Sequence, residues 1–69
     1  MPIYQIYDEK EPLNSYVDMF PGILQALPIV DKMFQIKAIK GDLTGARPSI
    51  ACVCANTNIV IREYSEVDE

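Results

Sequence analysis

The first third of the chain alternates between short apolar runs and polar breaks. Residues Pro2 to Tyr7, "PIYQIY", are rich in β-branched and aromatic residues and stop at the polar cluster "DEKEPLN", so they predict a first strand. Ser15 comes next, with Asp18 three positions later, in the pattern of a helix-capping box. The apolar residues that follow have the spacing of one helical face, namely Tyr16, Met19, Phe20, Ile23, Leu24 and Leu27. We therefore predict a helix from Ser15 to Leu27.

Two prolines interrupt this predicted helix. Pro21 in its middle would cost about 3 kcal/mol, whereas proline is favoured at the first position of a helix. A short turn that ends at Phe20, followed by a helix that begins at Pro21, is therefore the less costly arrangement. Pro28 directs the preceding Leu27 away from helical angles, so we expect the helix to end or kink there, with "IVDKM" as a last turn.

The second half of the chain has the shorter periodicity of strands. Residues Met33 to Lys40, "MFQIKAIK", partly alternate and predict a second strand. Its apolar side would carry Phe34, Ile36 and Ala38. The next stretch, "GDLTGARP", has the glycine and proline punctuation of a loop. The segments "SIACVCA" and "NIVIREY" flank Asn56 and Thr57 and predict a hairpin, because asparagine tolerates the left-handed angles of a tight turn.

These elements predict a small single α+β domain, residues 1–69, in the order β-α-β-β-β. One helix packs on a mostly antiparallel sheet that ends in a C-terminal β-hairpin. The first two strands would be parallel if they were neighbours, because a helix connects them. Both faces of the hairpin strands are apolar, so one helix leaves a sheet face for another subunit or a partner protein to cover. We expect the acidic tail, residues 65–69, to be frayed.

Composition agrees with a folded domain. Hydrophobic residues make up 49% and charged residues 23% of the 69 residues, far from the composition of disordered chains. A chain this short has one core and often gains stability by oligomerising, so we expect a homodimer. It has no apolar run of membrane-spanning length, and its N-terminus lacks the basic start and long apolar centre of a secretory signal. We therefore expect an intracellular, cytoplasmic protein that binds no membrane.

The charge of the chain is unevenly distributed. The net charge is −4, but residues 1–31 carry −4, residues 32–47 carry +3 and residues 48–69 carry −3. Net acidity argues against direct nucleic-acid binding, whose affinity comes largely from lysine and arginine on phosphates. A small anionic ligand at the basic middle segment remains compatible with this distribution.

Few side chains of the sequence are suited to catalysis or metal binding. The chain contains no histidine, so a serine or cysteine nucleophile lacks its usual base, and the acidic pairs fall in predicted loops or at the terminus. A zinc ion needs four ligands, so Cys52 and Cys54 would require carboxylates or a second subunit. We expect both cysteines to be free thiols that pack as small hydrophobes on one strand face. We expect no catalytic residue, no metal and no cofactor.

The loop after the second predicted strand is a candidate anion site. Gly41 and Gly45 permit a backbone path whose amides point into a concavity, and Lys37, Lys40 and Arg47 supply positive charge. The sequence "GDLTGAR" is not a Walker loop, because the lysine and the serine or threonine after its second glycine are missing. The alternative is an ordinary connector in which the glycines serve turn angles.

Two functions follow from these features. The first is a non-enzymatic interaction protein that binds and modulates or inhibits a larger protein, as is typical of small acidic phage-encoded or regulatory proteins; its location would then be the host cytoplasm if phage-encoded. Its acidic ends suit a partner with a basic surface. The partner-binding candidates are Asp8, Glu9, Glu11, Glu66, Asp68 and Glu69. The alternative is a small oligomeric protein that binds an anion or nucleotide at the loop from Gly41 to Arg47.

Overall fold

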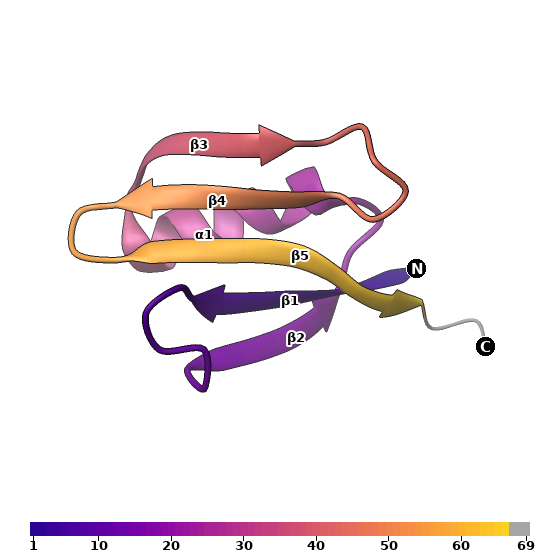
Figure 1. Cartoon of the computed structure of the whole chain (residues 1–69), viewed down its shortest axis with the longest axis horizontal. Helices are drawn as coiled ribbons and strands as arrows, with labels where there is room; N and C mark the ends of the chain where they lie inside the picture. The colour runs from indigo at the N-terminus through magenta and orange to yellow at the C-terminus, as the bar shows by residue number, and fades with distance from the viewer. Residues whose placement is uncertain (67–69) are drawn as a thin grey trace.

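The computed structural model describes residues 1–66, which fold into a five-stranded antiparallel sheet and one helical segment. The elements are β1 (Pro2–Asp8), β2 (Ser15–Met19), the 3₁₀ turn η1 (Ile23–Ala26), α1 (Leu27–Phe34), β3 (Ile36–Asp42), β4 (Ser49–Cys54) and β5 (Asn58–Glu66). The strand order across the sheet is β2-β1-β5-β4-β3, and η1 and α1 lie on one face of it (Figure 1). The predicted α+β class is therefore confirmed.

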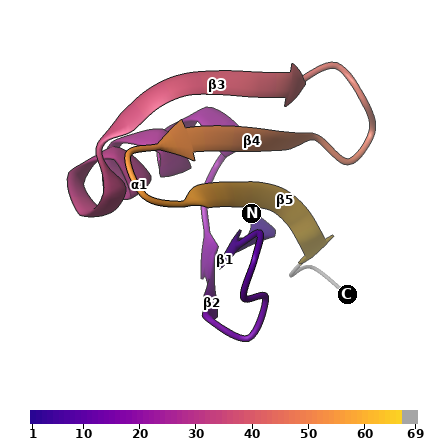
Figure 2. The same cartoon turned by 60° about the vertical axis from the view of Figure 1, so that its left-hand side comes forward.

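The predicted C-terminal hairpin is confirmed. β4 and β5 pair antiparallel, with Ile50 opposite Ile61 and Cys52 opposite Ile59. The amide of Cys54 donates to the carbonyl of Thr57 at 3.0 Å and closes the turn. β1 and β2 are turned steeply relative to β3 and β4, so the sheet is strongly twisted (Figure 2).

The core lies between the helical segment and one face of the sheet. Alternate residues of β1, β4 and β5 point toward the helix, as the period of two along a strand requires, and Val30 of α1 meets them from the other side. The buried apolar residues are Tyr4, Ile6, Phe20, Ile23, Ala26, Val30, Ile50, Cys52, Cys54, Ile59 and Ile61. The accessible surface of the molecule is 4626 Å², close to the roughly 4,400 Å² typical of a folded monomer of this mass.

The predicted helix from Ser15 to Leu27 is wrong in its first part. Ser15–Met19 is the edge strand β2, which pairs with β1 so that Tyr16 lies opposite Ile6 and Val17 opposite Gln5. The segment "SYVDM" contains aromatic and β-branched residues that suit a strand, and pairing with β1 outweighs the helical spacing. The sheet therefore gains a strand, and the order becomes β-β-helix-β-β-β.

The effect predicted for Pro28 is also wrong. Pro28 lies in the first turn of α1, where its missing amide would have no intrahelical partner in any case, so the proline begins the helix instead of ending it. The segment expected as a last turn is the body of α1. The helix ends at Gln35, whose backbone is left-handed, with φ 59°, and whose amide donates to the carbonyl of Asp31 at 2.8 Å.

The second predicted strand is displaced along the sequence. It begins at Ile36 and continues to Asp42, because Met33 and Phe34 belong to α1. The register with β4 shifts between Ile36 and Ala38, and this bulge places Ala38 on the opposite side of the sheet from Ile36. β1 and β3 lie apart in the sheet, so the conditional parallel pairing does not arise.

The sheet face opposite the helix is open, as the two-sided apolar pattern predicts. Val60 and Tyr7 are half-buried on it, and Val17 is exposed near the sheet edge. Arg62 covers part of this face: its guanidinium lies 5.3 Å from the centre of the Tyr7 ring, and its Nε donates to Gln5 Oε1 at 3.1 Å. The open face is therefore partly apolar and partly screened by one cation.

The predicted fraying of the tail from Ser65 is wrong for its first two residues. The backbone of Ser65 and Glu66 continues β5 and lies opposite Ile3 and Pro2. The remaining residues of that predicted tail, 67–69, lie outside the described residues.

Candidate functional site

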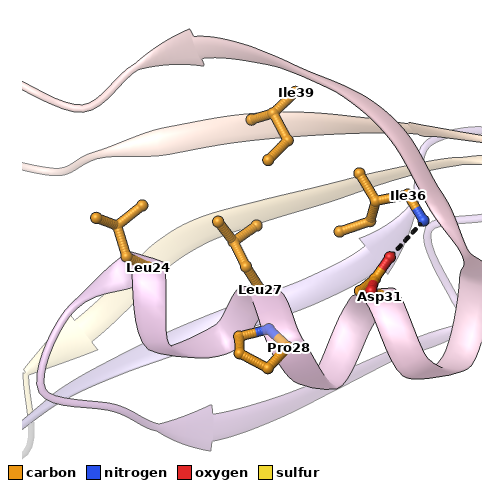
Figure 3. A pocket seen from close by; sticks show the side chains of 6 residues that line it. All are labelled: Leu24, Leu27, Pro28, Asp31, Ile36 and Ile39. Carbon is orange, nitrogen blue, oxygen red and sulfur yellow. Dashed lines mark hydrogen bonds between the residues drawn. The ribbon is translucent and has the colours of Figure 1, made fainter.

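An open apolar groove runs between the helical segment and β3 (Figure 3). Its volume is about 460 Å³, within the roughly 300–1,000 Å³ typical of ligand pockets. It is lined by Leu24, Leu27, Pro28, Asp31, Ile36 and Ile39. Leu24 and Leu27 come from the helical side and the two isoleucines from the strand, so the groove has an apolar wall on each side (Figure 3).

Local structure explains why these side chains converge. Leu24 and Leu27 are three residues apart and share a face of the helical segment. Ile36 and Ile39 are also three apart, a spacing that a regular strand would direct to opposite sides; the bulge brings both to the groove. Asp31 fixes the end of the groove, because its Oδ1 accepts the amide proton of Ile36 at 3.0 Å (Figure 3).

Two large apolar side chains of the groove are exposed to water. Leu24 is 53% and Ile39 48% exposed, although both lie beside the core. Covering such surface is favourable by about 25 cal/mol per Å² of apolar area. The groove can therefore bind an apolar group through the hydrophobic effect. The sequence pattern predicts that Leu24 and Leu27 face the sheet, but it does not reveal that the strand facing Leu24 lies at the sheet edge.

The candidate anion residues are spread over a strand and its following loop. Lys37 lies at the bulge of β3, and Arg47 lies at the end of the loop. Lys40 pairs with Ala51, next to the pair of Ile39 with Cys52; since Ile39 lines the groove, Lys40 points to the open face. The structure therefore brings Lys40 and Ile39 to opposite sides of one strand.

The two glycines of the predicted loop have different roles, since Gly41 belongs to β3 and only Gly45 lies in the loop. Gly41 has φ +132°, and a Cβ added to it would lie 2.7 Å from the carbonyl oxygen of Ser49, so glycine permits the close approach of β4. A Cβ on Gly45 would meet nothing nearer than the amide nitrogen of Arg47 at 3.9 Å. The conformation of Gly41 is thus required by strand pairing.

A carboxylate already occupies hydrogen-bond donors of the loop. Asp42 Oδ1 accepts the amide proton of Thr44 at 2.8 Å and the hydroxyl proton of Thr44 at 2.6 Å. The hydroxyl and then the amide of Thr44 lower the pKa of Asp42. This arrangement supports the connector interpretation, and anion binding at the loop remains a prediction.

The acidic partner-binding candidates form two separate groups. Asp8, Glu9 and Glu11 lie at the turn between β1 and β2, whereas Glu66 pairs with Pro2 at the other end of β1. Seven strand residues place these ends about 20 Å apart. Asp68 and Glu69 lie outside the described residues.

The β1–β2 turn is held by backbone and side-chain hydrogen bonds. Asp8 Oδ1 accepts the amide proton of Lys10 at 2.9 Å, and this bond is the main cause of the lowered pKa of Asp8. The hydroxyl of Thr57 also favours the charged carboxylate, although the buried Thr57 Oγ1 makes no hydrogen bond of ordinary geometry. Thr57 and Lys10 belong to a polar pocket of about 230 Å³ at the adjacent β4–β5 turn.

Cys52 and Cys54 pack as predicted. Both thiols are free and buried on the helix-facing side of β4, and Cys54 Sγ lies 3.6 Å from the carbonyl oxygen of Cys52. Burial is the main cause that raises the pKa of each thiol, with a smaller contribution from Cys54 for Cys52 and from Asp31 for Cys54. Within residues 1–66, no three side chains of histidine, cysteine, aspartate or glutamate form a group suited to a metal ion.

Comparisons with known proteins identify no relative. The sequence matches no protein-family model, and searches of curated proteins and of solved structures give no match. None of the helices in the described part of the chain has the length and apolar character needed to cross a membrane.

Proposed function

We propose that this chain is a non-enzymatic interaction protein that binds and modulates a larger protein through the groove between the helical segment and β3. The observation that carries the proposal is the exposure of Leu24 and Ile39 inside a hollow of about 460 Å³. Contiguous apolar surface in a concave site is a common mark of a protein or ligand contact, whereas single exposed apolar residues are ordinary.

Charge supports a protein partner and helps orient it. The acidic turn residues Asp8, Glu9 and Glu11 lie next to β2 at one edge of the sheet, and Lys37 and Lys40 lie on β3 at the other. Separated charges of this kind orient a partner during encounter. A partner with a basic region facing the turn would associate more slowly with an Asp8→Asn, Glu9→Gln, Glu11→Gln variant than with the wild type.

A matched pair of leucine substitutions tests the groove. Leu24→Gln removes an apolar group from the groove, while Leu13→Gln makes the same change at a residue that is 97% exposed in the β1–β2 turn. Wild type and both variants are used to capture proteins from the source cells, and each specific protein is then purified and titrated against all three. We expect the purified partner to bind the wild type and Leu13→Gln equally and Leu24→Gln at least about tenfold more weakly.

The outcomes of this comparison are distinct. If the partner binds the wild type, Leu24→Gln and Leu13→Gln equally, the interface lies elsewhere and the groove is not the binding site. Circular dichroism and urea unfolding of the two variants control for folding, because a change in an exposed side chain is expected to alter stability by less than about 1 kcal/mol.

A further inference from the structure

The outer edge of β3 offers backbone hydrogen-bonding groups beside the groove. Among the strands in residues 1–66, β3 is the last in the sheet order and pairs with β4 alone. Alternate amides and carbonyls of an edge strand point away from the sheet and can pair with another chain. The amide of Ile36 is already bound to Asp31, so the accessible edge begins after it.

The groove lies where the side chains of an added strand would point. In a strand paired with β3, every second side chain would face the helix side of the sheet, where Ile39, Leu24 and Leu27 form apolar walls. The intervening side chains would face the open side, which also carries Lys40. The geometry therefore selects an extended segment with apolar residues at alternate positions.

Charge selects among such segments. Residues 32–47 carry +3 within a chain of −4, and Lys37 and Lys40 are both exposed on β3. The nearby acids Asp31 and Asp42 each accept a backbone amide proton of their own chain, from Ile36 and Thr44. Acidic side chains on an added strand would therefore be favoured near the lysines, and a second β3 would bring lysines against lysines.

We propose that β3 and the groove bind an extended acidic segment of a partner protein as a sixth strand, with apolar side chains alternately in the groove. The inference rests on the proposed function and adds to it the chemistry of the partner. The competing explanation is that the lysines and the bulge serve only to protect the edge from pairing, as such features commonly do.

Synthetic peptides provide the probe. Three fluorescein-labelled peptides of about eight residues are compared. The first alternates leucine with glutamate, and the second alternates leucine with lysine. The third is the glutamate peptide with N-methyl groups on alternate amides. Fluorescence anisotropy with the full chain measures affinity, and ¹⁵N–¹H spectra locate the contact. We expect the glutamate peptide to bind at least about tenfold more tightly than the lysine peptide, to shift β3 amides and to lose binding on N-methylation.

Charge reversal on the protein completes the test. Lys37→Glu, Lys40→Glu should reverse the preference toward the lysine peptide, and Leu24→Gln should weaken both peptides while the fold is retained. Absence of binding, equal affinity for both charges, retained binding after N-methylation, or shifts on β2 instead of β3 would each overturn strand addition. Concentration-dependent self-association mapped to β3 would also overturn it in favour of a second copy. If the peptides fail to bind but Leu24→Gln weakens binding of the captured partner, strand addition is overturned and the proposed function is retained.

Discussion

Gly41, near the end of β3, and Gly45, in the following loop, provide a sharp test of which glycine the strand pairing requires. In Gly41→Ala, the new Cβ would lie 2.7 Å from Ser49 O and 2.8 Å from Ile50 Cα, closer than real Cβ contacts. The backbone angle of φ +132° is also one that residues other than glycine rarely adopt. Either the strand pairing or the backbone angle must change, so this substitution strains the sheet itself.

The expected magnitude follows from these two effects. Strain at a disfavoured backbone angle costs of order 1–3 kcal/mol, and a steric contact with backbone atoms of β4 adds to it, so we expect a loss of about 2–4 kcal/mol. A domain of this size has a free energy of unfolding of only about 3–10 kcal/mol. A loss of this size lowers Tm by about 15–30 °C.

Gly45→Ala is the matched control. Its Cβ would have an ordinary contact at 3.9 Å, and its φ is not positive, so we expect a change within about 0.5 kcal/mol or a small gain from the stiffer unfolded chain. Urea unfolding of both variants and the wild type, followed by circular dichroism, measures the difference. Equal stability of the two variants would refute the argument that strand pairing requires glycine at position 41.

Three further predictions concern titration, thiol chemistry and the basic loop. The pKa of Asp8 is lowered in the folded chain, so its contribution to stability is present above its unfolded pKa near 3.8 and is lost as pH falls through the folded pKa. Urea unfolding at several pH values should therefore show a smaller loss of stability at acid pH for Asp8→Asn than for the wild type. Cys52 and Cys54 are buried with raised pKa values, so mass spectrometry should show slow alkylation in the native protein and rapid alkylation in urea; fast native labelling would contradict their burial. If the loop binds anions, phosphate or mononucleotides should raise Tm in the wild type and not in Lys40→Ala, Arg47→Ala; an absence of response in the wild type leaves the loop as a connector.

The hairpin of β4 and β5 could be predicted because its signals are local. Its strands are apolar runs rich in β-branched residues, and Asn56 and Thr57 interrupt them where the turn occurs. Burial of Cys52 and Cys54 follows from the tendency of free cysteine to pack as a small hydrophobe. These features need no knowledge of distant partners, so the sequence alone is sufficient for them.

β2 could not be predicted because two periodicities coincide in it. Tyr16 and Phe20 have helical spacing, but Tyr16 packs from a strand, where its hydroxyl lies 3.8 Å from Met33 Sδ, and Phe20 is buried after the strand has ended. The pairing with β1 decides between them, and a six-residue turn joins the two strands without a short hairpin motif. The effect of Pro28 is difficult to predict from the sequence because proline interrupts a helix interior but is favoured in its first turn.

The groove depends on long-range pairing. β1 joins the sheet beside β5 and not beside β3, so β3 is left at an edge. The pairing of β1 with β5 joins segments that are far apart in the sequence. The bulge that turns Ile39 toward Leu24 also arises from the register with β4. The only sequence signal was a pair of lysines within an apolar strand, which is typical of an edge.

The distribution of charge over the sheet also bears on the expected homodimer. Two copies paired antiparallel through β3 would bring Lys37 and Lys40 of one copy close to those of the other, since both lysines lie near the middle of the strand. Edge-to-edge pairing with two-fold symmetry is thus disfavoured at β3, since such an interface brings the same surface of both copies together. The open face, which carries Val60 and Tyr7, is a surface that a two-fold dimer could use instead. Such a dimer would leave β3 and the groove accessible, so self-association and binding of an acidic strand would use different surfaces.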